Sequence, residues 1–266
     1  MSTNRDYIPF LIPLILLTVF FFIPIALMIY IAGPRSIVSA FMDVQFLSSV
    51  ELTFLSATIS TAVAVLVGTP VAYLLSRRII GSSKTNLFSN LLISPLTIPH
   101  TVVGIMLLIL FTPISPIHAL VPGLSLVNSF VGLIAALFFV SAPIYLISMK
   151  EYFDRMEPRY EMIGMSLGAS PLEAFIKIAV PNSKRGILRV ALISWGRAIS
   201  EFGSLLILTY FVTLAPVFEY VRPASVYVWY QYEVYGLNAV LGYSAALLLI
   251  SMVVLVAMIV VSYKND

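Results

Sequence analysis

Six long apolar runs, almost free of charged side chains, constrain this chain more than any other feature of its sequence. A helix of roughly 20 apolar residues crosses the ~30 Å hydrocarbon core of a bilayer, so each run is predicted to be one membrane-spanning helix. The expected fold class is an all-α integral membrane protein with about six transmembrane helices, in a single transmembrane domain over residues 1–266. The predicted spans cover residues 7–32, 52–75, 87–111, 127–149, 190–212 and 237–261.

The overall composition excludes several other classes of protein. With 60% apolar and only 10% charged residues, the chain is not an ordinary soluble domain. Its net charge of +3 does not indicate a nucleic-acid binder, because the basic residues are scattered between the apolar runs. The lack of cysteine excludes disulfides and cysteine-ligated metals, and we predict no metal site. The first run is too long for a signal peptide and contains Pro13 and Pro24, so we expect it to remain a span.

Positive charges are distributed unequally between the two sides of the membrane that six spans would define. Twelve Lys and Arg residues lie on the side shared by both termini, and only Arg35 and Arg222 lie on the other. Because cytoplasmic loops carry an excess of Lys and Arg, we expect a multi-pass protein of the cell membrane with both termini in the cytoplasm. The twelve are Arg5, Arg77, Arg78, Lys84, Lys150, Arg155, Arg159, Lys177, Lys184, Arg185, Arg189 and Lys264.

The predicted cytoplasmic loop over residues 150–189 is much longer than a connection between neighbouring helices requires. Its centre carries the start signal of a short helix. Ser170 is a good N-cap, Pro171 fits the first helical position, and Glu173 completes a capping box. Gly168 can close the helix before it. The sequence therefore predicts two short helices in this loop, separated near Gly168.

The second of these helices is predicted to present Leu172, Phe175 and Ile176 near one another. A short helix outside the membrane has little reason to be apolar unless something covers it. The residues alone leave two interpretations open: this face docks on another protein, or it lies on the helix ends of the same chain.

The spacing in this loop resembles the signature of binding-protein-dependent ABC permeases, a Gly followed after nine residues by Ile-x-Leu-Pro. Gly168, Ile178 and Val180-Pro181 stand at that spacing, while the acidic residue expected six positions before the Gly is replaced by Met162, with Glu161 one place earlier. The resemblance implies a coupling helix that sits in a cleft of a separate ATPase subunit. Its residues here would be Gly168, Ala169, Ser170, Pro171, Leu172, Glu173, Ala174, Phe175 and Ile176.

Two further stretches, residues 94–104 and 194–203, look like those of molybdate/tungstate permeases, particularly the archaeal ones. The resemblance implies an ATP-driven importer of a tetrahedral oxyanion. Its partners would be a second copy of the chain, two ATP-binding cassette subunits and an extracytoplasmic oxyanion-binding protein. ATP and Mg would bind the ATPase subunits, so this chain would be a non-catalytic permease with no cofactor of its own.

Two other functions remain as alternatives. A sulfate-type ABC permease would carry a doubly charged tetrahedron of similar size. An ion-coupled secondary carrier could use Arg197 and Glu201 inside the fifth span, but it would not need the long loop. Gly164-Met165-Ser166-Leu167-Gly168 matches a hydrolase pattern, yet it lies in a predicted cytoplasmic helix without the strand or the histidine that the pattern needs.

The translocation pathway is predicted to involve residues of the third and fifth spans. Pro95 and Pro99 should bend the third span, and a bent helix offers unpaired backbone groups to a cavity. His100 is expected to donate to a carbonyl freed by the proline, with a role as proton relay or oxyanion donor as the alternative. Thr101 follows it directly.

In the fifth span, Arg197 and Glu201 are four residues apart and hence lie on one helix face near the middle of the membrane. Ser194, Ser200 and Ser204 extend this polar stripe. The pair either fixes helix packing by mutual neutralisation, or it offers positive potential to a passing dianion. The packing interpretation is favoured, because a strong anion trap would hinder release.

Overall fold

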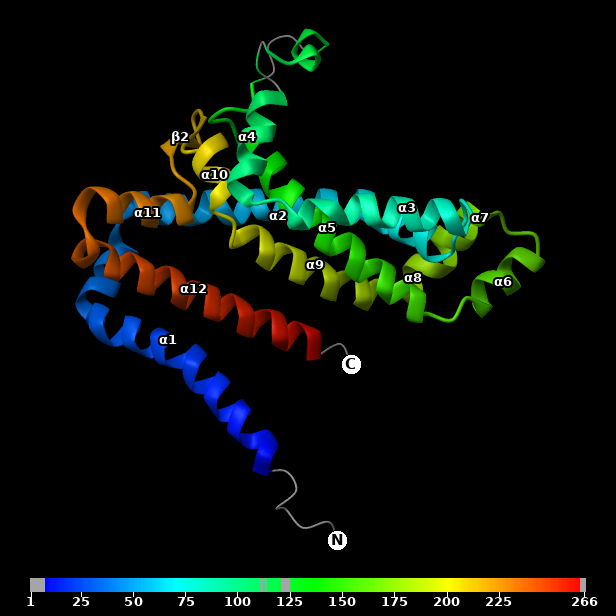
Figure 1. Cartoon of the computed structure of the whole chain (residues 1–266), viewed down its shortest axis with the longest axis horizontal. Coiled ribbons are helices and arrows are strands. Elements are labelled where there is room, and N and C mark those ends of the chain that lie inside the picture. The colour runs from blue at the N-terminus through cyan, green and yellow to red at the C-terminus, as the bar shows by residue number, and fades with distance from the viewer. Residues whose placement is uncertain (1–7, 111, 113, 121–124, 264–266) are drawn as a thin grey trace. The chain divides into compact units, whose positions relative to one another are not determined.

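A computed structural model describes residues 8–110, 112, 114–120 and 125–263 (Figure 1). The first predicted span begins at residue 7 and the third ends at residue 111, and these two residues, with Arg5 and Lys264, lie outside the described part. The α-helices are α1 Ile8–Met42, α2 Val44–Ser76, α3 Ser82–Ile93, α4 His100–Leu110, α5 Phe130–Arg155, α6 Arg159–Ser166, α7 Pro171–Ala174, α8 Val180–Asn182, α9 Lys184–Ile199, α10 Gly203–Leu208, α11 Ala224–Tyr235 and α12 Leu237–Tyr263. The 3-10 helices η2 Ser94–Thr97 and η3 Pro116–Ala119, the π-helix η4 Phe175–Ala179 and the strands β1 Val212–Leu214 and β2 Phe218–Val221 complete the elements.

The expected class, a helical integral membrane protein, is confirmed. Four helices of the described chain are long and apolar enough to cross a membrane, and one bent pair would make a fifth span. The four are Pro9–Met42, Val44–Ser76, Phe130–Arg155 and Leu237–Met258. The structure adds a small antiparallel hairpin, in which Val212 pairs with Val221 and Leu214 with Phe218.

The third predicted span is sharply bent, as its prolines predicted. The segment Ser82–Thr97 and the helix His100–Leu110 meet at 107°. Ile98 between them is extended, with φ −80° and ψ 128°, which is the conformation that a residue before a proline prefers. Neither Pro95 nor Pro99 has an N–H for the helical ladder, so the chain breaks here.

The fifth predicted span, residues 190–212, is not one continuous helix. α9 ends at Ile199, and α10 begins only at Gly203 and lasts six residues before the hairpin. The Glu201 carboxylate accepts a hydrogen bond from the backbone N–H of Ser204, 2.9 Å away, and so binds a free N–H in the first turn of α10. Hydropathy alone did not reveal this break, because the segments before and after residues 200–202 are both largely apolar.

The chain divides into two units, residues 1–47 with 228–253 and residues 48–227 with 254–266. In the first unit, α1 is kinked at Gly33, whose φ is +71°. A Cβ added to Gly242 of α12 would lie 2.6 Å from the Ser36 carbonyl oxygen, so the two backbones approach closely there. Tyr243 donates to Asp43 at 2.6 Å, and Asp43 also accepts from the N–H of Gln45 at the start of α2. That all residues form one domain stays a prediction.

The second unit holds two buried clusters of side chains. One joins α5 to α10 and the hairpin through Leu133, Leu205 and Phe218. The other joins α5 to α2 and α9 through Tyr145 and Tyr73, among others. These clusters fix the positions of the two regions that carry the candidate sites.

Candidate functional site

The predicted loop over residues 150–189 is largely helical. α5 continues to Arg155, and α6, α7, η4 and α8 follow before α9 begins at Lys184. Gly168, with φ +96°, ends α6, and its N–H donates to the Met165 carbonyl at 3.0 Å.

The predicted capping box of α7 is present. The N–H of Glu173 donates to Ser170 Oγ at 3.2 Å, and the N–H of Ser170 donates to Glu173 Oε2 at 3.0 Å. Lys177 Nζ lies 2.8 Å from Glu173 Oε1. The hydrogen bonds from Lys177 and Ser170 lower the pKa of the Glu173 carboxyl to about 2. The Glu173 carboxylate of this cap is therefore charged at neutral pH.

The three apolar side chains of this region do not share one environment. Leu172 is 65% exposed, and Ile176 is also exposed. Phe175 instead turns inward, where its ring centroid lies 4.9 Å from that of Tyr73 in α2. Both interpretations of the apolar face thus describe part of it: Phe175 packs on the chain's own helix, while Leu172 and Ile176 remain uncovered in the described chain.

An ion pair that the sequence did not reveal ties this loop to the end of α2. Glu161 in α6 is buried, and its Oε1 lies 2.8 Å from Arg77 Nη2. Tyr73 Oη donates to Glu161 Oε2 at 2.9 Å, and Arg77 Nη1 donates to the Phe153 carbonyl at the end of α5 at 2.8 Å. The only signal in the sequence was that Glu161 stands one position before the expected acid, which left its role open.

The second region of interest lies where the two broken spans meet. A Cβ added to Gly203, at the start of α10, would lie 3.0 Å from the Cβ of His100, at the start of α4. One added to Gly104, a turn further along α4, would lie 2.7 Å from the Ser204 carbonyl oxygen. The break in the third run therefore lies directly beside the break in the fifth run. Gly104 and Gly203 have no side chain, so the backbones of α4 and α10 can approach closely here.

At this junction His100, Arg197 and Glu201 form a cluster. Arg197 Nη2 lies 3.1 Å from Glu201 Oε2, and His100 Nδ1 lies 2.9 Å from the same oxygen. Arg197 Nη2 is also 2.8 Å from His100 Nε2. The expectation that His100 donates to a backbone carbonyl thus gives way to an interaction with charged side chains.

Only some of the other predicted pathway residues lie at this cluster. Ser200 accepts from Arg197 Nη1 at 3.2 Å, and Ser204 Oγ donates to Glu201 Oε1 at 2.9 Å, so both belong to the cluster. Thr101 is exposed next to His100, and the Pro99 carbonyl accepts from Val103. Ser194 lies apart, because its buried hydroxyl donates to the Ser141 carbonyl of α5 at 3.1 Å.

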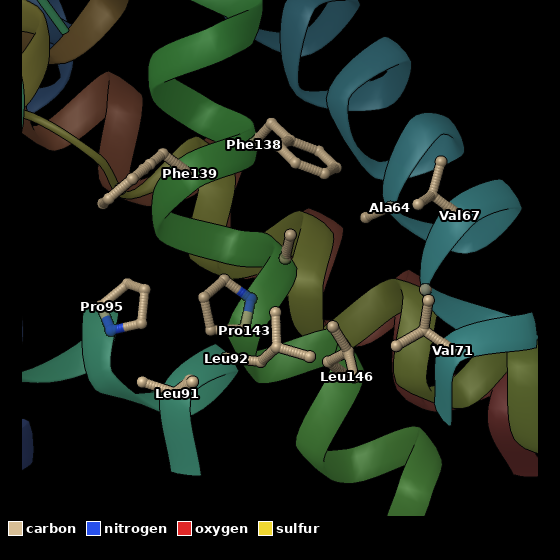
Figure 2. A pocket seen from close by; sticks show the side chains of 12 residues that line it. Ala64, Val67, Val71, Leu91, Leu92, Pro95, Phe138, Phe139, Pro143 and Leu146 are labelled. Atoms are coloured by element: carbon tan, nitrogen blue, oxygen red, sulfur yellow. The ribbon is translucent and has the colours of Figure 1, made fainter. Parts of the chain in front are cut away.

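A separate pocket of about 270 Å³ lies between α2, α3, η2 and α5. Figure 2 shows its side chains converging, with Val67 and Val71 facing Leu91 and Leu92 across the space. Its lining carries no charged or hydrophilic side chain, so it does not suit an oxyanion. It is lined by Ala64, Val67, Gly68, Val71, Leu91, Leu92, Pro95, Phe138, Phe139, Ala142, Pro143 and Leu146.

Comparison with known proteins identifies the family of this helical membrane chain. The sequence profile of the family described as "Binding-protein-dependent transport system inner membrane component" matches residues 64–264. The chain belongs to this permease family. It is accordingly a multi-pass membrane subunit of the ABC transporter permease type, as the signature around Gly168 predicted.

Individual relatives give a finer comparison with this permease. The chain is 31% identical over 184 residues to the molybdate/tungstate transport system permease protein WtpB of Pyrococcus furiosus, a match covering 69% of this chain and 65% of that protein. This permease thus spans less than two thirds of that relative. It is 29% identical over 238 residues to a probable molybdenum ABC transporter permease protein of Haloferax volcanii, covering 90% of this chain and 83% of that protein.

The fold also matches a solved transporter. A chain from a bacterial alginate ABC transporter, in complex with its alginate pentasaccharide-bound periplasmic protein, superimposes with a TM-score of 0.67 and 17% sequence identity. The match covers 96% of this permease and 93% of that chain. At this identity the similarity supports the permease fold and leaves the substrate to other arguments.

Proposed function

We propose that this permease is the membrane subunit of an ATP-driven importer that moves a tetrahedral oxyanion, molybdate or tungstate, delivered by an extracytoplasmic binding protein. Two copies of the chain would pair with two ATP-binding cassette subunits. The similarity to molybdate/tungstate permeases supports the substrate. The observation that carries the ATPase partnership is the uncovered pair Leu172 and Ile176 on a helix whose start is fixed by its capping box.

A docking element must present apolar side chains and keep its shape when the partner is absent. The capping box fixes the start of α7, and Phe175 anchors its end against Tyr73. Leu172 and Ile176 are then held outward, and each would lose contact with water on docking. Burying such a side chain contributes about 1.5–3 kcal/mol.

Replacing Leu172 by Asp tests this arrangement. An unpaired carboxylate in a dry contact is strongly unfavourable, so the variant should insert normally but lose co-purification with the ATPase subunit and lose coupled transport. Val217→Asp is the matched control, because Val217 is 64% exposed in the β1–β2 turn and lies outside the loop over residues 150–189. It should behave as the parent. Normal ATPase binding by the Leu172 variant would show that α7 is not the docking element.

The substrate is tested with the assembled transporter in proteoliposomes. The binding protein and ATP are supplied, and uptake of molybdate, tungstate and sulfate is compared at equal concentration. Preferential uptake of molybdate or tungstate supports the proposal. Preference for sulfate would support the alternative permease, and uptake that continues without ATP would support a secondary carrier.

A further inference from the structure

The cluster of His100, Arg197 and Glu201 has an uneven distribution of exposure. The Glu201 side chain is fully buried, while those of Arg197 and His100 are 22% and 43% exposed. A pair that served packing alone would have no need to keep its cationic side open. A solute reaching this junction therefore meets the guanidinium and the imidazole first, and the carboxylate stays behind them.

The two oxygens of Glu201 have different partners. Oε1 accepts from the N–H and the hydroxyl of Ser204, both at 2.9 Å, and is thereby fixed to the start of α10. Oε2 accepts from Arg197 and His100. Arg197 Nη2 also lies close to both ring nitrogens of His100, 3.0 Å from Nδ1 and 2.8 Å from Nε2. The carboxylate is thus an internal anion bound by the two groups that face outward.

The charges of the cluster favour a transient anion rather than a trapped one. Arg197 and Glu201 cancel, so the open face carries positive potential without a net positive site. An unpaired arginine inside a membrane domain would be costly, and it would hold a dianion too tightly for release. The exposed Thr101, next to His100 in the chain, adds a hydroxyl group that can donate to an oxygen of an anion.

We propose that Arg197 and His100 form a transit site for a tetrahedral dianion, and that Glu201 is the resident counter-ion that limits how tightly this site holds it. This inference rests on the proposed oxyanion import and extends it to the residues that handle the anion. The substrate contacts the open edges of Arg197 and His100, while Glu201 keeps its bonds to Ser204. Departure of the dianion restores the neutral cluster.

The test uses the complete transporter in nanodiscs with sodium molybdate as the probe and no binding protein. Glu201→Gln removes the counter-ion but keeps an oxygen that can accept from Ser204. Molybdate retained in equilibrium dialysis at a subsaturating concentration should rise about tenfold, the effect of one neighbouring unit charge on a charged group. The transport rate should fall, because release becomes slow.

A second variant keeps the test informative if single changes affect folding. Arg197→Gln with Glu201→Gln replaces both charges by neutral amides of similar shape, which avoids an unpaired buried charge. This double variant should assemble normally, retain only background molybdate and fail to transport. Arg222→Gln is the control for general attraction of anions, and it should change retention by less than about twofold, because Arg222 lies over the Tyr210 ring outside the cluster.

The outcomes separate this inference from the proposed function. If the parent transports molybdate, unchanged retention in Glu201→Gln or normal transport by the double variant would overturn the transit site alone. If the parent transports no oxyanion under any condition, both the proposed function and the transit site are wrong. Higher retention in Glu201→Gln, with loss of binding in the double variant, supports both.

Discussion

The ion pair between Arg77 and Glu161 gives the sharpest quantitative prediction. In the structure, Tyr73 and Arg77 both donate to the Glu161 carboxylate. In Arg77→Gln this carboxylate stays buried and keeps only the hydrogen bond from Tyr73 of these two. Removing one partner of a buried ion pair costs roughly 3–5 kcal/mol, since the other charge is left uncompensated. The Arg77 side chain is only 14% exposed, so solvent offsets little of this. The carbonyls of Phe153 and Met156 also lose the hydrogen bonds from Arg77, and the Phe153 carbonyl keeps the one from the Met156 N–H at 3.1 Å.

The assay compares the free energy of unfolding of parent and variants in mixed detergent micelles. The double variant Arg77→Gln with Glu161→Gln should recover much of the loss, because no charge remains buried. Lys150→Gln is the control, since its ion pair with Asp154 at 2.7 Å is solvent-accessible and such pairs contribute about 1 kcal/mol or less. If Arg77→Gln costs no more than Lys150→Gln, the pair does not hold the loop in place, and the reasoning is refuted.

Two further predictions follow from exposure and packing. Single cysteines at the exposed positions Ser83 and Asn182 should be labelled only from the cytoplasm, and one at exposed Thr213 only from outside; a reversed pattern in intact cells would overturn the orientation. Gly104→Ala should lower the thermal midpoint of unfolding in detergent, because its Cβ would lie 2.7 Å from the Ser204 backbone. Gly196→Ala in α9 is the control and should be neutral or stabilising, because its Cβ would meet nothing within 4 Å. Equal effects of the two variants would mean that the α4–α10 contact is loose.

The sequence predicted those features that depend on local patterns. Apolar runs identified the helical membrane class, prolines located the bend before His100, and the spacing from Ser170 to Glu173 predicted the capping box. It did not predict the break at Ser200–Phe202, because that break depends on a bond between Glu201 and the backbone of the next helix. The inward turn of Phe175 was left open for a similar reason, since only the tertiary contact with Tyr73 decides it.

Long-range polar partners were also beyond the reach of pattern analysis. Arg197 and Glu201 were paired correctly from their spacing of four, which places both on one helix turn. His100, 97 positions before Arg197, joined them only through the close approach of α4 and α10. Glu161 and Arg77 are 84 positions apart, and no local pattern links them.

Arg77 also bears on how force travels through the molecule. Arg77 lies at the end of α2, and its guanidinium donates to the Phe153 carbonyl of α5 and to the Glu161 carboxylate of α6. One turn earlier in α2, Tyr73 packs against Phe175, which follows α7. Hydrogen bonds between charged groups are shorter and stronger than those between neutral groups, and their geometry is more specific. In the proposed complex, a displacement of α7 by the ATPase would therefore be transmitted to α2 and α5 through the hydrogen bonds of Arg77. The bent third span and the short α10, built on helix breaks, would be the compliant parts that deform in response.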